Sequence, residues 1–171
     1  PISFESTAED KLNQEEILAN YRKAMEEDLA NGNLELHHKR GDTELSLQEA
    51  KVLLEAEYQL PFLAHATMEP MNCTAWVQEG KCEIWCGSQN PLGAKAAVAE
   101  ILDLDLDQVI IHNQLLGGGF GRRSETDVIK QAVLIAKEVD FPVKLIWSRE
   151  EDIQHDVYRE ATISRLKAGL D

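Results

Sequence analysis

Glycine and arginine dominate one short stretch of the chain, which has the clearest chemical character in the sequence. Residues 115–123 read LLGGGFGRR. Three consecutive glycines cost conformational entropy in a helix or a strand, so they indicate a loop whose backbone must approach another group closely. Amide groups at a loop before a helix point outward and favour an anion. Arg122 and Arg123 add positive charge to a chain whose net charge is −14.

Two other interpretations of this loop stay open on spacing alone. The loop could be an ordinary glycine-rich turn with solvated arginines, or it could bind phosphate. It does not match G-x-x-x-x-G-K-S/T, and Arg122 stands where G-x-G-x-x-G counted from Gly117 needs its last glycine. A stand-alone phosphate- or nucleotide-binding module that uses Gly117–Arg123 is therefore the alternative function.

A metal site is a weaker possibility elsewhere in the chain. His65 and Glu69 are four residues apart, which would place them on one helix face, but Pro61 and Pro70 bracket the segment and argue against a helix. One histidine and one carboxylate are too few ligands. We expect a buried histidine and a hydrogen-bonded glutamate, and no metal-ligating residues.

Three cysteines, an odd number, argue against a complete disulfide framework. Cys82 and Cys86 are four residues apart and do not form a C-x-x-C pair. No further ligands cluster near them. We expect buried, unreactive thiols.

Turn and capping signals indicate the elements that position the loop. Two β-rich runs, 73–77 and 82–86, flank a turn that contains Gly80 and predict a hairpin. Asn90-Pro91 predicts a helix start. The apolar face of this helix is predicted to use Leu92, Ala96, Ala99 and Leu102. The later elements are a strand over 109–111, a helix over roughly 125–138, a strand over 143–147 and a further strand that begins at Thr162.

Residues 1–59 are predicted to be a lead-in with an amphipathic helix and a short strand. Asn13 with Glu16 is a capping pattern, and Asn31-Gly32 is a stop, so a helix is expected over roughly 14–30. A short helix at roughly 43–50 and a strand over 52–60 follow, although 53–56 could also extend the helix.

The order hairpin, helix, strand, glycine loop, helix, strand predicts an α+β fold: a two-layer α/β sandwich with a mixed sheet, preceded by the helical lead-in. Strict strand–helix alternation is missing at the start, which argues against a doubly wound nucleotide-binding fold. The sandwich is expected over residues 60–171.

The acidic composition disfavours nucleic acid, whose phosphates need clustered lysine and arginine, and a polybasic membrane-surface role for the same reason. No window approaches the ~20 apolar residues that a membrane span needs. The chain begins at Pro1, so we expect it to be cut from a longer polypeptide.

Four segments, taken in order, resemble the large molybdopterin-binding subunit of the xanthine dehydrogenase and aldehyde oxidase family. They are residues 60–73 (LPFLAHATMEPMNC), 84–91 (IWCGSQNP), 117–123 (GGGFGRR) and 144–152 (KLIWSREED) with the histidine, tyrosine and arginine that follow. The Arg-Arg ending is most similar to the isoquinoline 1-oxidoreductase branch, which is aldehyde dehydrogenase-like. The resemblance covers residues 60–171 strongly and the preceding ones weakly.

The resemblance implies a fold of the molybdenum-cofactor-binding type and a set of site residues. Gln89 would sit beside the molybdenum and donate a hydrogen bond to an oxygen ligand, although it could be a plain helix-capping residue. Gly118, Gly119, Phe120 and Gly121 would bring backbone and ring against the pterin, and Phe120 could instead belong to the core. Arg122 and Arg123 would face cofactor phosphates, or form salt bridges to nearby acids.

The resemblance also implies an activity, a cofactor and partners. Such enzymes hydroxylate with oxygen derived from water, using a molybdopterin cofactor that is expected here in its cytosine dinucleotide form. Ser124 stands where xanthine dehydrogenases have glutamate, which favours an N-heteroaromatic or aldehyde substrate over a purine. The expected partners are an iron–sulfur subunit or domain and the remaining domains of the same large subunit. The glutamate base and the iron–sulfur cysteines lie outside these residues, so we expect the isolated chain to be inactive and free of cofactor.

Overall fold

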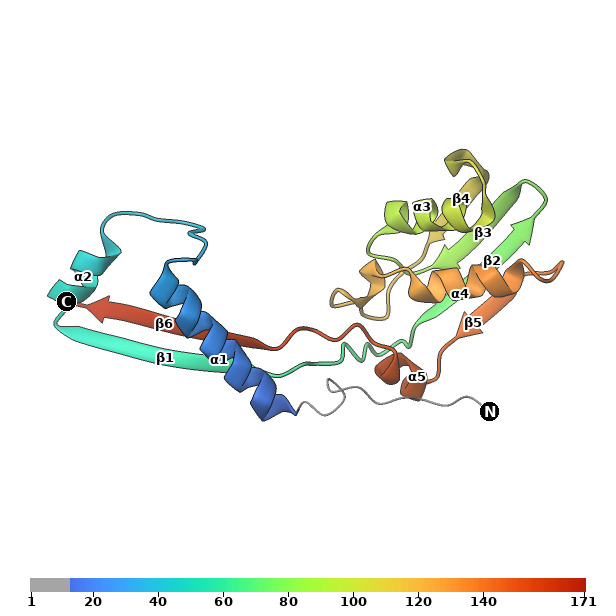
Figure 1. Cartoon of the computed structure of the whole chain (residues 1–171). Coiled ribbons are helices and arrows are strands. Elements are labelled where there is room, and N and C mark those ends of the chain that lie inside the picture. Colours follow the sequence, from blue (N-terminus) through green and yellow to red (C-terminus); the bar gives the residue numbers. More distant parts are fainter. Residues whose placement is uncertain (1–12) are drawn as a thin grey trace. The chain divides into compact units, whose positions relative to one another are not determined.

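The computed structural model describes residues 13–171, which divide into two compact units (Figure 1). Residues up to Leu63 group with Glu160–Asp171, and Ala64–Arg159 form the second unit. Residues 1–12 of the predicted lead-in lie outside the described part of the chain. The boundary predicted at residue 60 stays a prediction.

The first unit begins with helix α1, Gln14–Asn31. The side chain of Asn13 accepts a hydrogen bond from the Glu16 amide, the Glu16 side chain accepts one from the Asn13 amide, and Gly32 ends the helix at a φ of 67°. This capping box satisfies amide groups that the first turn leaves free. Helix α2, Thr43–Glu49, follows with Asp42 as its cap. Both helices confirm the sequence prediction.

A two-stranded antiparallel ribbon completes this unit. Strand β1, Val52–Leu60, pairs along its whole length with strand β6, Thr162–Leu170. The strand predicted at 52–60 is confirmed, and residues 53–56 do not extend the preceding helix. Arg165 connects the ribbon to α1, because it forms ion pairs with Glu57 on β1 and Glu26 on α1.

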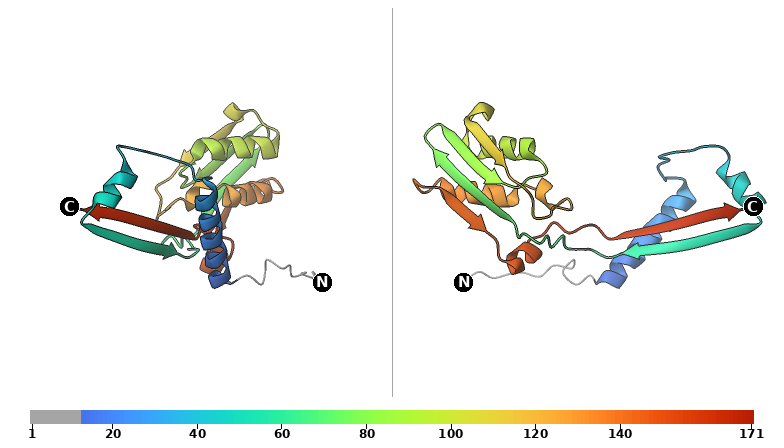
Figure 2. Two further views of the ribbon diagram at one scale, coloured as in Figure 1. Left: turned by 60° about the vertical axis from the view of Figure 1, so that its left-hand side comes forward. Right: turned by 180° about the vertical axis from the view of Figure 1, so that it is seen from behind.

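The second unit is a four-stranded sheet in the order β4-β3-β2-β5. The strands are β2 (Asn72–Gln78), β3 (Lys81–Cys86), β4 (Val109–Asn113) and β5 (Val143–Ile146). β2 pairs antiparallel with β3 and β5, while β3 pairs parallel with β4. Helices α3 (Pro91–Leu102) and α4 (Asp127–Ala136) cover one face of this sheet (Figure 2). The predicted two-layer sandwich with a mixed sheet is confirmed.

The side chains of the β2–β3 hairpin alternate between the two faces of the sheet, and those on one face form much of the core of the second unit. Cys73 and Ala75 on β2 and Cys82, Ile84 and Cys86 on β3 point to the helical layer and are buried. All three cysteines are free and buried, as expected. Burial, the larger cause, raises the pKa of the Cys82 thiol to about 11.

Two details of the second unit differ from the prediction. Helix α3 buries Ala94, Val98 and Ala99. Of the predicted apolar face, Ala99 and Leu102 do contact the core, whereas Ala96 is exposed and Leu92 is 81% exposed, so that half of the prediction is wrong. A short helix, α5 (Arg149–Gln154), follows β5 and was not predicted, because its charged sequence carries no apolar period. No helix among the described residues is long and apolar enough to cross a membrane.

Candidate functional site

The glycine loop runs from the end of β4 to a 3-10 turn at Arg122–Ser124. Gly118 and Gly121 have φ values of 102° and 109°, which favour glycine. Phe120 has a φ of 55° although it carries a side chain, and this side chain is 70% exposed. Phe120 is therefore not a core residue, and the loop presents its ring to the surroundings.

Gln89 contacts this loop directly, as the predicted site requires. The side-chain Oε1 of Gln89 accepts hydrogen bonds from the backbone amides of Gly121 at 3.1 Å and Arg123 at 3.2 Å. The backbone amide of Gln89 donates to the Arg123 carbonyl at 3.0 Å. Backbone amides can only donate, so the side-chain oxygen must face them. The Nε2 group of Gln89 then points away, and within residues 13–171 it has no acceptor.

The fit between Gln89 and the loop requires a glycine at position 119. A Cβ atom added to Gly119 would lie 2.6 Å from the Gln89 Oε1 and 2.8 Å from its Cδ, well inside contact distance. Position 119 therefore accepts no larger residue unless Gln89 moves.

Three successive amides of the loop are left without partners. The N–H groups of Gly118, Gly119 and Phe120 donate to no acceptor among the described residues. The Gln89 Nε2 group lies close to these amides, since it would be 3.3 Å from a Cβ atom added to Gly119, and it is a fourth unpartnered donor. Such a set of donors suits a ligand with oxygen or sulfur acceptors.

Glu69 anchors the start of the loop. Its Oε2 accepts from the Gly117 amide at 2.9 Å and from Arg123 at 2.9 Å, while its Oε1 accepts from Asn72 at 2.8 Å. Burial alone would raise the pKa of Glu69, but the Asn72 and Gly117 hydrogen bonds and the Arg123 charge outweigh it and lower the pKa. The expected hydrogen-bonded glutamate is confirmed.

Arg123 is buried beneath the loop, with 1% of its side chain exposed. Besides Glu69 it donates to the carbonyl of Gly118 at 2.8 Å through Nε and to the carbonyl of Glu69 at 2.8 Å through Nη2. Its guanidinium therefore connects the 65–72 segment to the glycine loop.

Arg122 is equally buried and pairs with two acids. It donates to both carboxylate oxygens of Asp127, at 3.0 and 2.6 Å, and its Nε lies 2.9 Å from Asp156 Oδ1 without hydrogen-bond geometry. Its guanidinium also lies over the Trp147 ring, 5.6 Å from the centroid. The salt-bridge alternative is thus what the structure shows for both arginines, and contact of either with a cofactor phosphate stays a prediction.

The side chain of His65 is 9% exposed and is held by Asp156. Its Nδ1 lies 3.0 Å from Asp156 Oδ1, and its backbone amide donates to Oδ2 of the same carboxylate at 2.5 Å. The segment around His65 is not helical, so His65 and Glu69 do not share a helix face. The residue as a whole is partly buried, so the expected burial applies to its side chain and not to its backbone. Among the described residues no three potential ligands gather at a metal-sized site.

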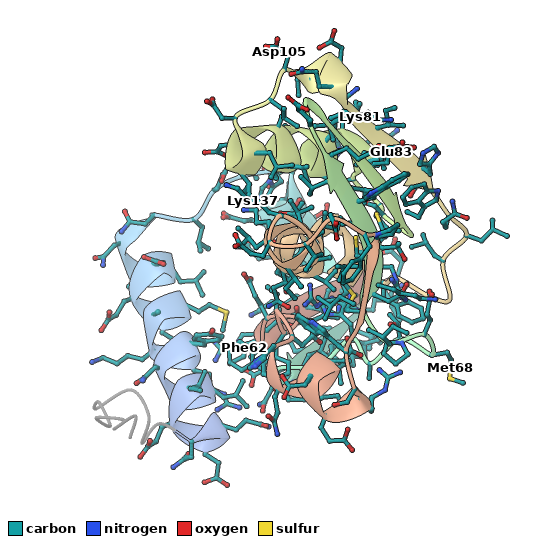
Figure 3. All side chains as sticks on the ribbon, turned by 90° about the vertical axis from the view of Figure 1, so that its right-hand side faces the viewer. Phe62, Met68, Lys81, Glu83, Asp105 and Lys137 are labelled. Atoms are coloured by element: carbon teal, nitrogen blue, oxygen red, sulfur yellow. The ribbon has the colours of Figure 1, made fainter. Side chains whose placement is uncertain are left out.

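Sequence reasoning missed Asp156 and Arg149. Asp156 accepts from His65 and contacts Arg122, and Arg149 donates to the carbonyl oxygens of Thr67 and Met68. The side chain of Met68 itself projects outward from the backbone and is exposed (Figure 3). An acid directly after His155 carries no local signal of burial, because its partners come from residues far away in the sequence.

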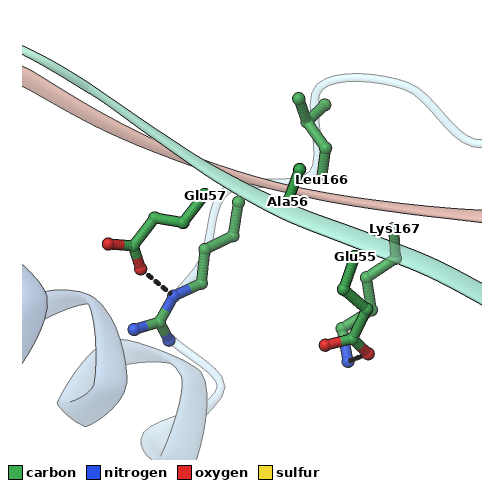
Figure 4. Close-up of a pocket in the computed structure, with 6 residues that line it drawn as sticks. Glu55, Ala56, Glu57, Leu166 and Lys167 are labelled. Carbon is green, nitrogen blue, oxygen red and sulfur yellow. Dashed lines mark hydrogen bonds and ion pairs between the residues drawn. The ribbon is translucent and has the colours of Figure 1, made fainter.

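A separate hollow lies on the two-stranded ribbon (Figure 4). It is lined by Glu55, Ala56, Glu57, Arg165, Leu166 and Lys167. None of the predicted site residues lines it, and its polar groups pair with one another, as in the Glu55–Lys167 and Glu57–Arg165 ion pairs. The glycine loop with Gln89 is therefore the candidate site.

The sequence matches the model of the molybdopterin cofactor-binding domain family over residues 25–171. It is 35% identical over 115 residues to the isoquinoline 1-oxidoreductase subunit beta of Brevundimonas diminuta, which covers 67% of this chain and 15% of that protein. It is 34% identical over 123 residues to a membrane-bound aldehyde dehydrogenase (pyrroloquinoline-quinone) of Gluconacetobacter polyoxogenes, with 71% and 16% covered.

Among solved structures, quinoline 2-oxidoreductase from Pseudomonas putida 86 is similar with a TM-score of 0.63 at 15% identity, covering 77% of this chain and 17% of that one. At this identity the similarity shows the fold. The chain belongs to the molybdopterin cofactor-binding domain family. This confirms the resemblance that the four segments indicated, and the chain spans 15% and 16% of the length of the two curated relatives named above.

Proposed function

We propose that the glycine loop and Gln89 form one wall of the cofactor pocket of a molybdenum hydroxylase. The observation that supports this is the row of unpartnered donors, the amides of Gly118, Gly119 and Phe120 together with the Gln89 Nε2 group. The sulfur atoms of a pterin dithiolene and the oxygen ligands of molybdenum are acceptors, so they complement these donors. The residues present therefore fit the cofactor.

Each residue of the loop has a distinct proposed role. Gln89 donates a neutral hydrogen bond toward an oxygen ligand of the metal, while Gly118, Gly119 and Gly121 let the backbone approach the pterin. Phe120 covers the cofactor with its exposed ring. Arg122 and Arg123 hold the loop in shape through their buried ion pairs, and any contact with phosphate would use the same residues.

When bound, the cofactor supplies the redox chemistry of hydroxylation with water-derived oxygen. The residues of this chain orient it and exclude water from one side. Ser124 follows the two arginines in place of the glutamate of xanthine dehydrogenases, which supports an N-heteroaromatic or aldehyde substrate. The proposed cofactor is the cytosine dinucleotide form, and the proposed electron acceptor is an iron–sulfur subunit or domain.

Metal and pterin analysis of the complete protein that contains this chain tests the proposal. We expect an equimolar amount of molybdenum, and cytidine monophosphate after mild acid hydrolysis of the released cofactor. The isolated chain should contain neither and should not oxidise aldehydes or N-heteroaromatics. A complete protein without molybdenum, together with tight binding of a mononucleotide by the isolated chain, would instead support the phosphate-binding alternative.

A further inference from the structure

His65 presents one ring nitrogen to the glycine loop, and none of the roles above uses it. A Cβ atom added to Gly121 would lie 3.6 Å from His65 Nε2, so this nitrogen faces the backbone of Gly121. The His65 side chain is only 9% exposed. Within the described residues, Nε2 has no hydrogen-bond partner.

The other ring nitrogen fixes the tautomer. Asp156 lies 3.0 Å from His65 Nδ1, and a carboxylate can only accept, so Nδ1 carries a proton. Asp156 is itself 1% exposed and lies 2.9 Å from the Nε of Arg122. The neutral imidazole then has its lone pair on Nε2.

This lone pair differs in kind from the unpartnered N–H groups of the site. The amides of Gly118, Gly119 and Phe120 and the Gln89 Nε2 group are donors, whereas His65 Nε2 is an acceptor. An acceptor beside a row of donors can fix which way round a ligand lies, because the ligand must offer a donor at that one place.

We infer that the Asp156–His65 pair is a positioning device for the bound cofactor, in which His65 Nε2 accepts a hydrogen bond from an N–H group of the pterin ring system. This inference depends on the proposed function, because it needs the pterin to occupy the loop. Asp156 acts only through His65, since it orients the imidazole and holds its proton on Nδ1.

Variants of the complete protein test this role through cofactor retention as well as activity. In His65→Leu, with the acceptor removed, pterin and molybdenum should be lost during dialysis about tenfold faster, on the order expected for one buried hydrogen bond. His65→Gln keeps an acceptor and should retain more cofactor. His112→Leu is the matched control, because the ring of His112 pairs with Glu83 and stacks on Trp85, on the sheet.

A second measurement does not depend on folding of the variants. Nitrogen-15 NMR of the unsubstituted chain, recorded as a pH series, should show that the neutral imidazole of His65 carries its proton on Nδ1. A neutral imidazole with its proton on Nε2 would overturn the inference, since that nitrogen would then donate.

Folded His65→Leu protein that retains its cofactor as the parent does would also overturn the inference, while leaving the proposed function intact. A parent protein without any pterin would instead refute the proposed function itself. Loss of cofactor from His65→Leu but not from His112→Leu supports the inference.

Discussion

At the contact between Gly119 and Gln89, one added carbon atom, the Cβ of an alanine at position 119, would clash with the Gln89 side chain. Gly119 does not have a positive φ, so alanine is conformationally acceptable there and the only penalty is the clash with the Gln89 amide. This separates a steric requirement for glycine from a conformational one.

A double-mutant cycle on these two residues tests the contact. We expect Gly119→Ala to cost about 1–3 kcal/mol of the free energy of unfolding, the usual range for overpacking. In a Gln89→Ala background the same change should cost far less, because the atoms that the Cβ meets are absent. Urea unfolding of the four proteins measures the difference. Equal costs in both backgrounds would show that the two residues are not in contact.

The hydrogen-bond and ion-pair partners of individual residues were the feature least predictable from the sequence. The GGGFGRR pattern indicated a loop of special geometry, and Gln89 was expected beside it. The sequence left open whether Arg122 and Arg123 face a ligand or nearby acids. Burial of a guanidinium depends on acids such as Asp156 that come from distant parts of the chain, and no local pattern records that pairing.

At the scale of elements, helix α3 shows how a burial pattern can be misplaced while the helix itself is predicted correctly. Alanines and leucines occur all around this helix, so more than one face looks apolar. Packing against β4 and α4 selects the side that carries Ala94 and Val98.

Two matched truncations on α3 distinguish the faces. Val98 is completely buried, so Val98→Ala should cost about 2 kcal/mol through lost burial and a small cavity. Leu92 is 81% exposed, and Leu92→Ala should change the stability by less than about 0.5 kcal/mol. Chemical denaturation of both variants gives the comparison. A larger cost for Leu92→Ala would mean that the leucine face packs inward.

The ion pairs that join α1 to the ribbon are predicted to contribute a stability that depends on pH in the acid range. Hydrogen bonds from Arg165 and Arg22 lower the pKa of Glu57 from 4.5 to about 2. A lowered carboxyl pKa stabilises the folded form fully above the unfolded value, and this stabilisation is lost as the pH falls from 4.5 through about 2.

Glu57→Gln should therefore reduce the dependence of stability on pH within that window. Unfolding followed by circular dichroism at several acid pH values measures this dependence. Glu79→Gln, at an exposed turn position, serves as the control and should keep the parent profile. A Glu57→Gln profile that matches the parent would show that these ion pairs contribute nothing to folding.

Most elements could be predicted because their signals are local. Asn13 with Glu16, Asn90-Pro91 and the Gly80 turn each lie within a few residues of the element that they begin or join. The pairing of β1 with β6 has no such signal, since Val52 pairs with Leu170. Likewise no local motif indicates that β4 pairs with β3, because helix α3 separates the two strands in the sequence.

At the scale of the whole molecule, the two units differ in how much apolar surface they bury. The side chains of β1 are all exposed, and those of β6 nearly so, whereas β2 and β3 alternate into a closed core. A two-stranded ribbon that buries so little apolar surface is marginally stable in water.

Hydrogen exchange of the isolated chain should reveal this difference. Amides of 52–60 and 162–170 should exchange much faster than those of 73–77 and 82–86, because opening the ribbon exposes little new apolar surface. Mass spectrometry of peptic fragments resolves the four segments. Equal protection in ribbon and core would show that the ribbon is stabilised by contacts other than its own pairing.

The ribbon is also a hairpin whose turn has been replaced by an entire folded unit. In the sequence, residues 64–159 come between its two strands, and Leu60 pairs with Thr162 at the end of the ribbon where this segment is inserted. Bringing the ends of so long an unstructured segment together is entropically costly, and a folded insert removes most of that cost in advance. Assembly should therefore be hierarchical: the sandwich of residues 64–159 folds first, and the two strands then pair, beginning at Leu60 and Thr162.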